Sequence, residues 1–289
     1  YAITILALFF IFTVSSFRLR IISNGNSLPS LSKSTSRIQS SLDEYVSVPL
    51  TELTKHIADQ PPIRLSDNRV PFKNRFVGLR HGQSDANVEG IISSNPNVGI
   101  NMHGLTKILG INQGKQAGHD LSQFLLDNSL TKESLLFISS DFKRAKETAL
   151  ICMETMGLQM SPLIIRIELR ERYFGDFDGK DLLFYNKVWP VDSINANNNQ
   201  NGVESINNVI ERVDSLLRDL ESTFNDKTIV LVSHADTLQI MQSFICSHHN
   251  SDVKGSNSCD SRQFHRYRFK NGEVRDMTRL PDPVDIVYK

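Results

Sequence analysis

The chain has 289 residues, of which 39% are hydrophobic and 22% charged, so it is long and apolar enough to bury the core of a globular protein. Its 32 Lys and Arg residues balance its 32 Asp and Glu residues, which excludes the overall basic field of a nucleic-acid-binding protein. An anion-binding site in this chain must therefore be assembled locally.

The first 42 residues differ in composition from the rest. Residues 1–14, YAITILALFFIFTV, are almost wholly apolar but shorter than the ~20 residues that span a bilayer, and they fit the centre of a signal peptide. A Ser-rich stretch with four basic residues and no acid before Asp43 follows, which is typical of a transit peptide. We expect 1–42 to be a targeting segment that resembles two-part plastid targeting sequences, with secretion or endomembrane retention as the alternative. No stable membrane association is expected after processing.

Residues 43–72 contain four prolines and little periodicity, which predicts a linker or a surface extension. The folded domain is expected over 73–289.

Hydrophobic patterning in this domain alternates between short apolar runs and segments with apolar residues at helical spacing. The runs predict strands at 75–82, 135–140, 161–171 and 228–234. The helical spacing predicts helices at 104–127, 142–157, 203–224 and 235–245, the second with Asp141 as its N-cap. This alternation predicts a single α/β domain with three α/β/α layers and a mostly parallel central sheet.

Two further features lie near the C-terminus. Asn271-Gly272 predicts the turn of an edge hairpin over 266–277, with His265, Arg266, Arg268 and Lys270 on its solvent face. The cysteines, Cys152, Cys246 and Cys259, show no CxxC spacing and no disulfide framework. A zinc site at Cys246, His248, His249 and Cys259 is disfavoured because the spacing fits no known metal pattern, so no metal is predicted.

Three predicted strands end in polar or charged residues. These ends are Arg80-His81, the 139–144 turn with Arg144, and Ser233-His234. Ligands of parallel sheets bind beyond the carboxyl ends of the strands, so we expect the three ends to open onto one crevice.

The residue types at this crevice suit a phosphate. Guanidinium groups bind phosphate oxygens in a bidentate way, and Arg144 also lies in the first turn of a helix, where the amides favour an anion. Nearby arginines lower the pKa of His81 and keep its imidazole neutral, so that it can attack phosphorus. His234 can donate to the oxygens, and Glu171 is placed to protonate the leaving group, with Glu168 as the alternative acid.

Five stretches in order, RHGQSDAN, SSDFKRAKETA, ELRERYFGDFDG, GVES and VSHADTLQ, resemble the histidine phosphatase superfamily in its phosphoglycerate-mutase-like branch. The resemblance covers about residues 73–245. It implies a phosphorylated nucleophile, His81; a proton donor, Glu171; and phosphate ligands at Arg80, Asn87, Arg144 and His234. It implies neither a metal nor a cofactor. For Asn87, a loop-capping role is the alternative.

Some positions depart from the mutases of this branch. Phe174 replaces a tyrosine that touches phosphoglycerate, Ala235 and Asp236 replace Gly-Asn, and Gln239 replaces an arginine. Residues 190–201, PVDSINANNNQN, form an Asn-rich loop in place of a proline-rich segment. A looser rim would admit water to the phosphohistidine, which favours a metal-independent phosphatase acting on a small phosphorylated metabolite. The alternatives are a cofactor-dependent phosphoglycerate mutase and a non-catalytic binder of a phosphorylated ligand.

Overall fold

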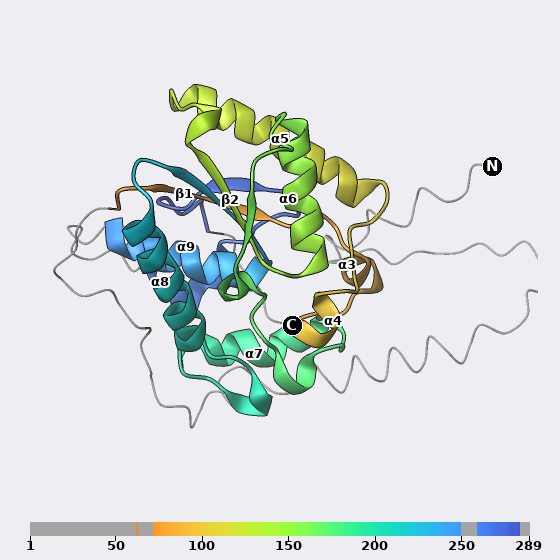
Figure 1. Cartoon of the computed structure of the whole chain (residues 1–289). Coiled ribbons are helices and arrows are strands. Elements are labelled where there is room, and N and C mark those ends of the chain that lie inside the picture. Colours follow the sequence, from red (N-terminus) through yellow and green to blue (C-terminus); the bar gives the residue numbers. More distant parts are fainter. Residues whose placement is uncertain (1–61, 63–71, 250–258, 284–289) are drawn as a thin grey trace, which may run out of the picture. The chain divides into compact units, whose positions relative to one another are not determined.

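The computed structural model describes residues 62, 72–249 and 259–283, which all belong to one compact unit, Val48–Lys289 (Figure 1). The targeting segment predicted over 1–42 lies outside the described residues, as does almost all of the predicted linker. No described helix combines the length and the apolar character that a membrane crossing requires.

Five strands form one sheet in the spatial order β3-β2-β4-β1-β5. They are β1 (Arg75–Arg80), β2 (Leu135–Ser139), β3 (Leu163–Ile165), β4 (Thr228–Ser233) and β5 (Val274–Asp276). The first four run parallel, and β5 runs antiparallel to β1. The predicted α/β class with a mostly parallel sheet is confirmed.

Seven described helices accompany the sheet. They are α3 (Asp85–Glu89), α4 (Pro96–Gly99), α5 (Leu109–Asp127), α6 (Lys143–Thr155), α7 (Tyr185–Asp192), α8 (Ile206–Thr223) and α9 (Ala235–His249). Short 3-10 turns connect several of them, including Ile167–Leu169 and Ser261–Arg266.

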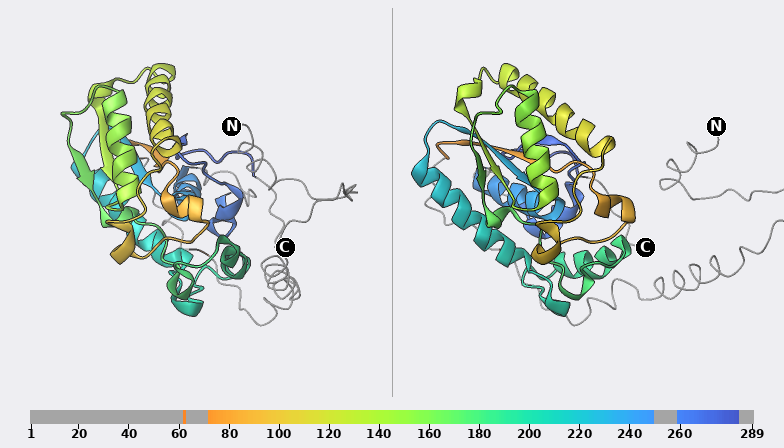
Figure 2. Two further views of the ribbon diagram at one scale, coloured as in Figure 1. Left: turned by 90° about the vertical axis from the view of Figure 1, so that its right-hand side faces the viewer. Right: turned by 45° about the vertical axis from the view of Figure 1, so that its right-hand side comes forward.

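Alternating residues of the central strands bury their side chains on opposite faces of the sheet. Val77 and Leu79 of β1 pack with α5 and α6, whereas Phe76 packs with α8 and α9. Figure 2 shows the sheet between these two pairs of helices, which gives the three predicted layers. Both faces of β4 are buried, in agreement with its continuous run of β-branched and Leu residues.

The sheet order brings the carboxyl ends of β1, β2 and β4 together. Arg80 is in register with Ser233, and Ser139 is in register with Val232. The residues that follow these strands therefore emerge at one edge of the sheet, as predicted.

Several predicted bounds are wrong. The strand predicted over 161–171 is only Leu163–Ile165, because the chain turns into the 3-10 helix Ile167–Leu169. The helix predicted from residue 203 begins at Ile206, after its N-cap Ser205. The helix predicted from residue 104 begins at Leu109, because Leu105 and Thr106 instead bond to Glu147 and to the carbonyl of Gln83. Asp141 does not cap α6, whose N-cap is Phe142, because the Asp141 carboxylate accepts from the guanidinium of Arg170.

The predicted edge hairpin is also wrong, although the Asn271-Gly272 turn is present and Gly272 has φ +75°. The strand after the turn, β5, pairs with β1, and residues 267–270 form no strand. Arginine side chains bind the backbone carbonyls of that segment. Arg275 donates to the carbonyls of Tyr267 and Arg268, and Arg80 donates to the carbonyl of Phe269. His265 is buried in the preceding 3-10 turn and does not face solvent.

The cysteine prediction needs a correction. Cys246 of α9 and Cys259 form a disulfide with their Cα atoms 5.8 Å apart, and Cys152 is a buried free thiol. A separation of 13 residues in the sequence does not by itself indicate this pairing, which depends on how close the fold brings the two Cα atoms.

Candidate active site

His81 follows the last residue of β1 and is buried with an exposed fraction of 3%. Its Nδ1 lies 2.7 Å from the carbonyl oxygen of Gly82, and Arg144 donates from Nε to its Nε2 over 3.1 Å. A carbonyl can only accept and a guanidinium can only donate, so Nδ1 carries the proton and Nε2 carries the lone pair. Burial, together with the charges of Arg144 and Arg80, holds the pKa of His81 well below its ordinary value. The geometry thus presents a neutral imidazole whose Nε2 is available as a nucleophile.

Arg144 is the second residue of α6, directly after the turn that follows β2. The guanidinium is fixed on one side by His81 and on the other by Ser93, whose hydroxyl accepts from NH1 and whose carbonyl accepts from NH2. It also lies over the ring of Phe142, 5.0 Å from the centroid. Burial lowers the pKa of Arg144 to about 10, so the group remains a cation at neutral pH.

His234 follows the last residue of β4 and is fully buried. Its ring centroid lies 5.1 Å from that of His81, and its Nε2 is 3.0 Å from the hydroxyl of Ser140. The Ser140 hydroxyl already accepts from the amide of Phe142, so its own hydrogen is free to point at His234. Burial and the charge of Arg144 lower the pKa of His234 well below its ordinary value.

Arg80 ends β1 and points its NH1 at the carbonyl of Phe269 over 2.7 Å. Among the described residues, neither Nε of Arg80 nor Nδ1 of His234 has a hydrogen-bond partner, although both atoms are buried. Buried polar atoms are nearly always paired, so two such atoms beside one nucleophile mark a site for a hydrogen-bonding ligand. Burial lowers the pKa of Arg80, and the carboxylate of Glu171 opposes this shift.

Glu171 lies in the segment after β3, close enough for its charge to act on both Arg80 and Arg144. Its Oε1 accepts from the backbone amides of Arg172 at 3.0 Å and Thr237 at 3.3 Å. These donors fix Oε1, which leaves Oε2 as the oxygen able to carry a transferable proton. Glu168, the alternative acid, instead forms an ion pair with Arg166.

Asn87 lies in α3, beside the turn that carries His81. Its Oδ1 accepts from the backbone amide and the hydroxyl of Ser84, which completes a capping box, and from Nδ2 of Asn271. This oxygen therefore serves a structural role, as the capping alternative predicted.

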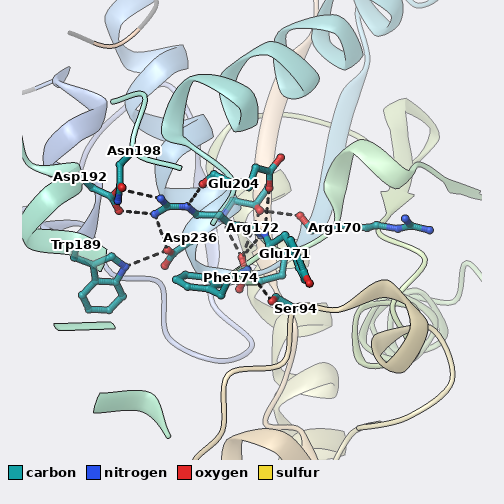
Figure 3. Close-up of polar contacts among 12 residues, drawn as sticks. Ser94, Arg170, Glu171, Arg172, Phe174, Trp189, Asp192, Asn198, Glu204 and Asp236 are labelled. Atoms are coloured by element: carbon teal, nitrogen blue, oxygen red, sulfur yellow. Dashed lines mark hydrogen bonds and ion pairs between the residues drawn. The ribbon is translucent and has the colours of Figure 1, made fainter. Parts of the chain in front are cut away.

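Three of the positions that depart from the mutases, Phe174, Asp236 and Gln239, are buried, whereas Ala235 is half-buried. Phe174 packs edge-on against Tyr185, and Gln239 accepts from the backbone amide of Phe269. Asp236 is 2% exposed and accepts from Nε1 of Trp189 at 3.1 Å, with NH1 of Arg172 3.7 Å away (Figure 3).

The Asn-rich segment is not a loose rim. Asn198 donates to Asp192, Asn207 donates to Asn197, and the amide of Asn197 bonds to Asn195. These amides connect the segment to the end of α7 and the start of α8.

Sequence reasoning missed several residues that support the site. Ser140, Ser93, Thr148 and Tyr185 carry small or common side chains whose roles appear only when the strands are assembled. Arg172 is fully buried and forms a bidentate ion pair with Asp192. The stretch ELRERYFGDFDG places it two residues after Arg170, but nothing local shows which of these two arginines is buried.

Together, two arginines, two neutral imidazoles and one carboxyl meet at the strand ends. Such a site can hold a tetrahedral oxyanion, accept its central atom at Nε2 of His81 and protonate a departing oxygen. The described residues include no group of three or more His, Cys, Asp or Glu side chains arranged to hold a metal ion.

Comparison with known proteins gives a family match. The sequence description of the histidine phosphatase superfamily (branch 1) matches residues 77–275. No curated protein matches the chain.

Solved structures share the fold. One is a mycobacterial glucosyl-3-phosphoglycerate phosphatase in complex with VO3, which is 23% identical with a TM-score of 0.54, over 69% of this chain and 90% of that one. A mycobacterial hydrolase is 23% identical with a TM-score of 0.52, over 69% of this chain and 86% of its own. The product of a Mycobacterium tuberculosis open reading frame is 18% identical with a TM-score of 0.51, over 70% and 89% of the two chains.

Proposed function

This chain belongs to the histidine phosphatase superfamily, branch 1, and we propose that it is a metal-independent phosphomonoester hydrolase acting on a small phosphorylated metabolite. The observation that carries this proposal is the placement of His81. Its Nε2 lone pair faces Arg144 at 3.1 Å, and its ring lies 5.1 Å from that of His234. The nucleophile and the charges that would stabilise the transferring group thus meet at one point.

In the first step, Nε2 of His81 attacks phosphorus and the bond from phosphorus to the ester oxygen breaks. The leaving oxygen takes the proton from Oε2 of Glu171, so the product is a neutral alcohol and a phosphohistidine. In the second step, Glu171 accepts a proton from water, which attacks phosphorus and releases inorganic phosphate. His81 and Glu171 then return to their starting forms.

Three groups would hold the phosphoryl oxygens during both steps. Arg80 offers its unpaired Nε, and His234 offers Nδ1 while its Nε2 accepts from Ser140. Arg144 adds a buried cation at the first turn of α6, where the helix dipole also favours an anion. Negative charge that builds on the oxygens would thus meet donors that are already in place.

The structural relatives support this proposal. The mycobacterial protein named as a glucosyl-3-phosphoglycerate phosphatase holds VO3, an oxyanion related to phosphate.

Hydrolysis of a panel of phosphomonoesters by the whole chain, in the presence of a chelator, tests the proposal. His81→Ala should abolish release of phosphate, whereas His119→Ala, on the exposed face of α5, should retain it. Interconversion of 2- and 3-phosphoglycerate that depends on added bisphosphoglycerate would instead identify a mutase. Binding of vanadate with no turnover of any ester would identify a non-catalytic binder.

A further inference from the structure

Trp189, a residue of α7, forms a hydrogen bond to a residue that lies close to His234. Its Nε1 donates to Oδ2 of Asp236 over 3.1 Å, and Asp236 lies two residues after His234, in the first turn of α9 (Figure 3). The same indole ring stacks on the ring of Tyr185 at 4.4 Å between centroids, with the two planes 15° apart. A single hydrogen bond therefore joins the turn that carries His234 to the aromatic side of α7.

Tyr185 lies near the phosphate site. Its ring contacts Phe174 at 5.0 Å, edge to face, and so lies between Phe174 and Trp189. Burial raises the pKa of the Tyr185 phenol, and the charges of Asp236, Glu171, Arg80 and Arg144 all act on it. The phenol thus lies within electrostatic reach of both phosphate-binding arginines.

The charges around Asp236 indicate whether this side chain acts as an anion or as a hydrogen-bond acceptor. The cation nearest to it, Arg172, is already engaged by Asp192 in two hydrogen bonds of 2.6 and 2.9 Å, whereas Asp236 is 3.7 Å from it. Burial and repulsion from Glu171 raise the pKa of Asp236 to about 7, although Arg172 opposes the shift. A carboxyl with a pKa near 7 is only partly ionised at neutral pH, and in either form it accepts the hydrogen bond from Trp189.

We propose that Asp236 is a positioning residue, which holds Trp189 by this hydrogen bond and thereby places Tyr185 as a specificity-determining wall of the phosphate site. The proposal rests on the proposed function for its kinetic consequences alone. Asp236 does not touch the reacting atoms in this account. Its effect passes through Trp189 to the ring that would face the ester group of the substrate.

A double-mutant cycle on kcat/KM tests the coupling. Asp236→Ala and Trp189→Phe each remove one side of the hydrogen bond, so each should lower kcat/KM about tenfold, mainly through KM. The double variant should be no worse than either single variant, because both changes break the same interaction. Asp236→Asn keeps an acceptor oxygen and should stay within about threefold of the wild type. Asp214→Asn, which removes a surface carboxylate of α8, is the matched control.

Trp189 is the only tryptophan in the chain, which provides a readout that needs no turnover. Its emission should change with a midpoint near pH 7 as Asp236 titrates, and Asp236→Asn should abolish this transition. The groups that act on Asp236 in this titration are Glu171, Arg172 and Asp192.

The kinetic cycle and the emission measurement separate the positioning role of Asp236 from the proposed function. If the wild type hydrolyses no ester, the proposed function fails and the emission measurement alone judges the role of Asp236. Additive losses in the cycle, a wild-type kcat/KM for Asp236→Ala, or an emission transition that persists in Asp236→Asn would each overturn the positioning role.

Discussion

Arg144 donates from Nε to Nε2 of His81 over 3.1 Å, so the nucleophile of this site is held by the cation that would bind its target. The same guanidinium is fixed from the other side by the hydroxyl and the carbonyl of Ser93. The bond to His81 orients the imidazole. Burial and the charge of Arg144 lower the pKa of His81. The bond must break before Nε2 can attack phosphorus.

Replacing Arg144 with lysine should lower kcat/KM by about 10²–10³, because a lysine keeps the charge but cannot contact His81 and Ser93 in a fork. Steady-state kinetics on one ester would measure the loss. Arg218→Lys, at an exposed position of α8, should change kcat/KM by less than about twofold and serves as the control. Near-normal kinetics for Arg144→Lys would mean that charge alone matters.

The nucleophile should stay active in mild acid. Only the neutral imidazole can attack, and the folded pKa of His81 lies well below 6.5, so lowering the pH through 6.5 should leave the ring unprotonated. Burial and the charges of Arg144 and Arg80 cause this shift, so Arg144→Gln should move the titration to higher pH.

NMR titration of the His81 ring, assigned with His81→Ala, separates this group from the ionisation of a substrate phosphate. Arg144→Lys, which retains the charge, should titrate nearly as the wild type does. A His81 ring that titrates near pH 6.5 in the wild type would contradict the electrostatic account.

The identity of the general acid can be tested through the leaving group. Glu171→Gln should lower kcat/KM, which reports the first step alone, by about 10²–10⁴ for an alkyl phosphate, because an alkoxide needs a proton to leave. The loss should be much smaller for para-nitrophenyl phosphate, whose phenolate leaves without one. Glu168→Gln is the matched control, since Glu168 is engaged with Arg166. Equal losses of kcat/KM on both substrates would rule out Glu171 as the general acid of the first step.

The turn after His81 passes directly against α5, with no room for a side chain. A Cβ on Gly82 would lie 2.5 Å from the backbone oxygen of Gly110. Gly82→Ala should therefore lower the free energy of unfolding by about 1–3 kcal/mol and reduce kcat, because the turn must move. Chemical denaturation measures the first effect. Gly90→Asn is the control, since that site has φ +69° and open space, which Asn tolerates.

Much of the fold could be predicted from the sequence because its local signals agree with its tertiary packing. The apolar runs of β1, β2 and β4 are buried as continuous strands, and the stripe on α8 packs into the core. The predictions failed where arginine side chains form hydrogen bonds that the local pattern does not show. Arg170 binds the carboxylate of Asp141, which therefore does not cap α6. Arg275 binds a backbone carbonyl that would have paired in the predicted hairpin strand.

The residues of the candidate site could be predicted from the sequence more fully than the residues that orient them. Arg80, His81, Arg144 and His234 are brought together because three parallel strands end at one edge. The partners that orient them depend on contacts across 50 to 100 residues, as between Arg144 and Ser93 or between His234 and Ser140. No local pattern encodes such pairs, and the link from Asp236 to Trp189 is of the same kind.

The most direct test of the central claim is to trap the phosphoenzyme by rapid quench with a ³²P-labelled ester and map the labelled residue. A covalent intermediate on His81 predicts label that survives alkali, is lost in acid, and is absent from His81→Ala. Turnover with label on another residue, or undiminished turnover by His81→Ala, would contradict the account.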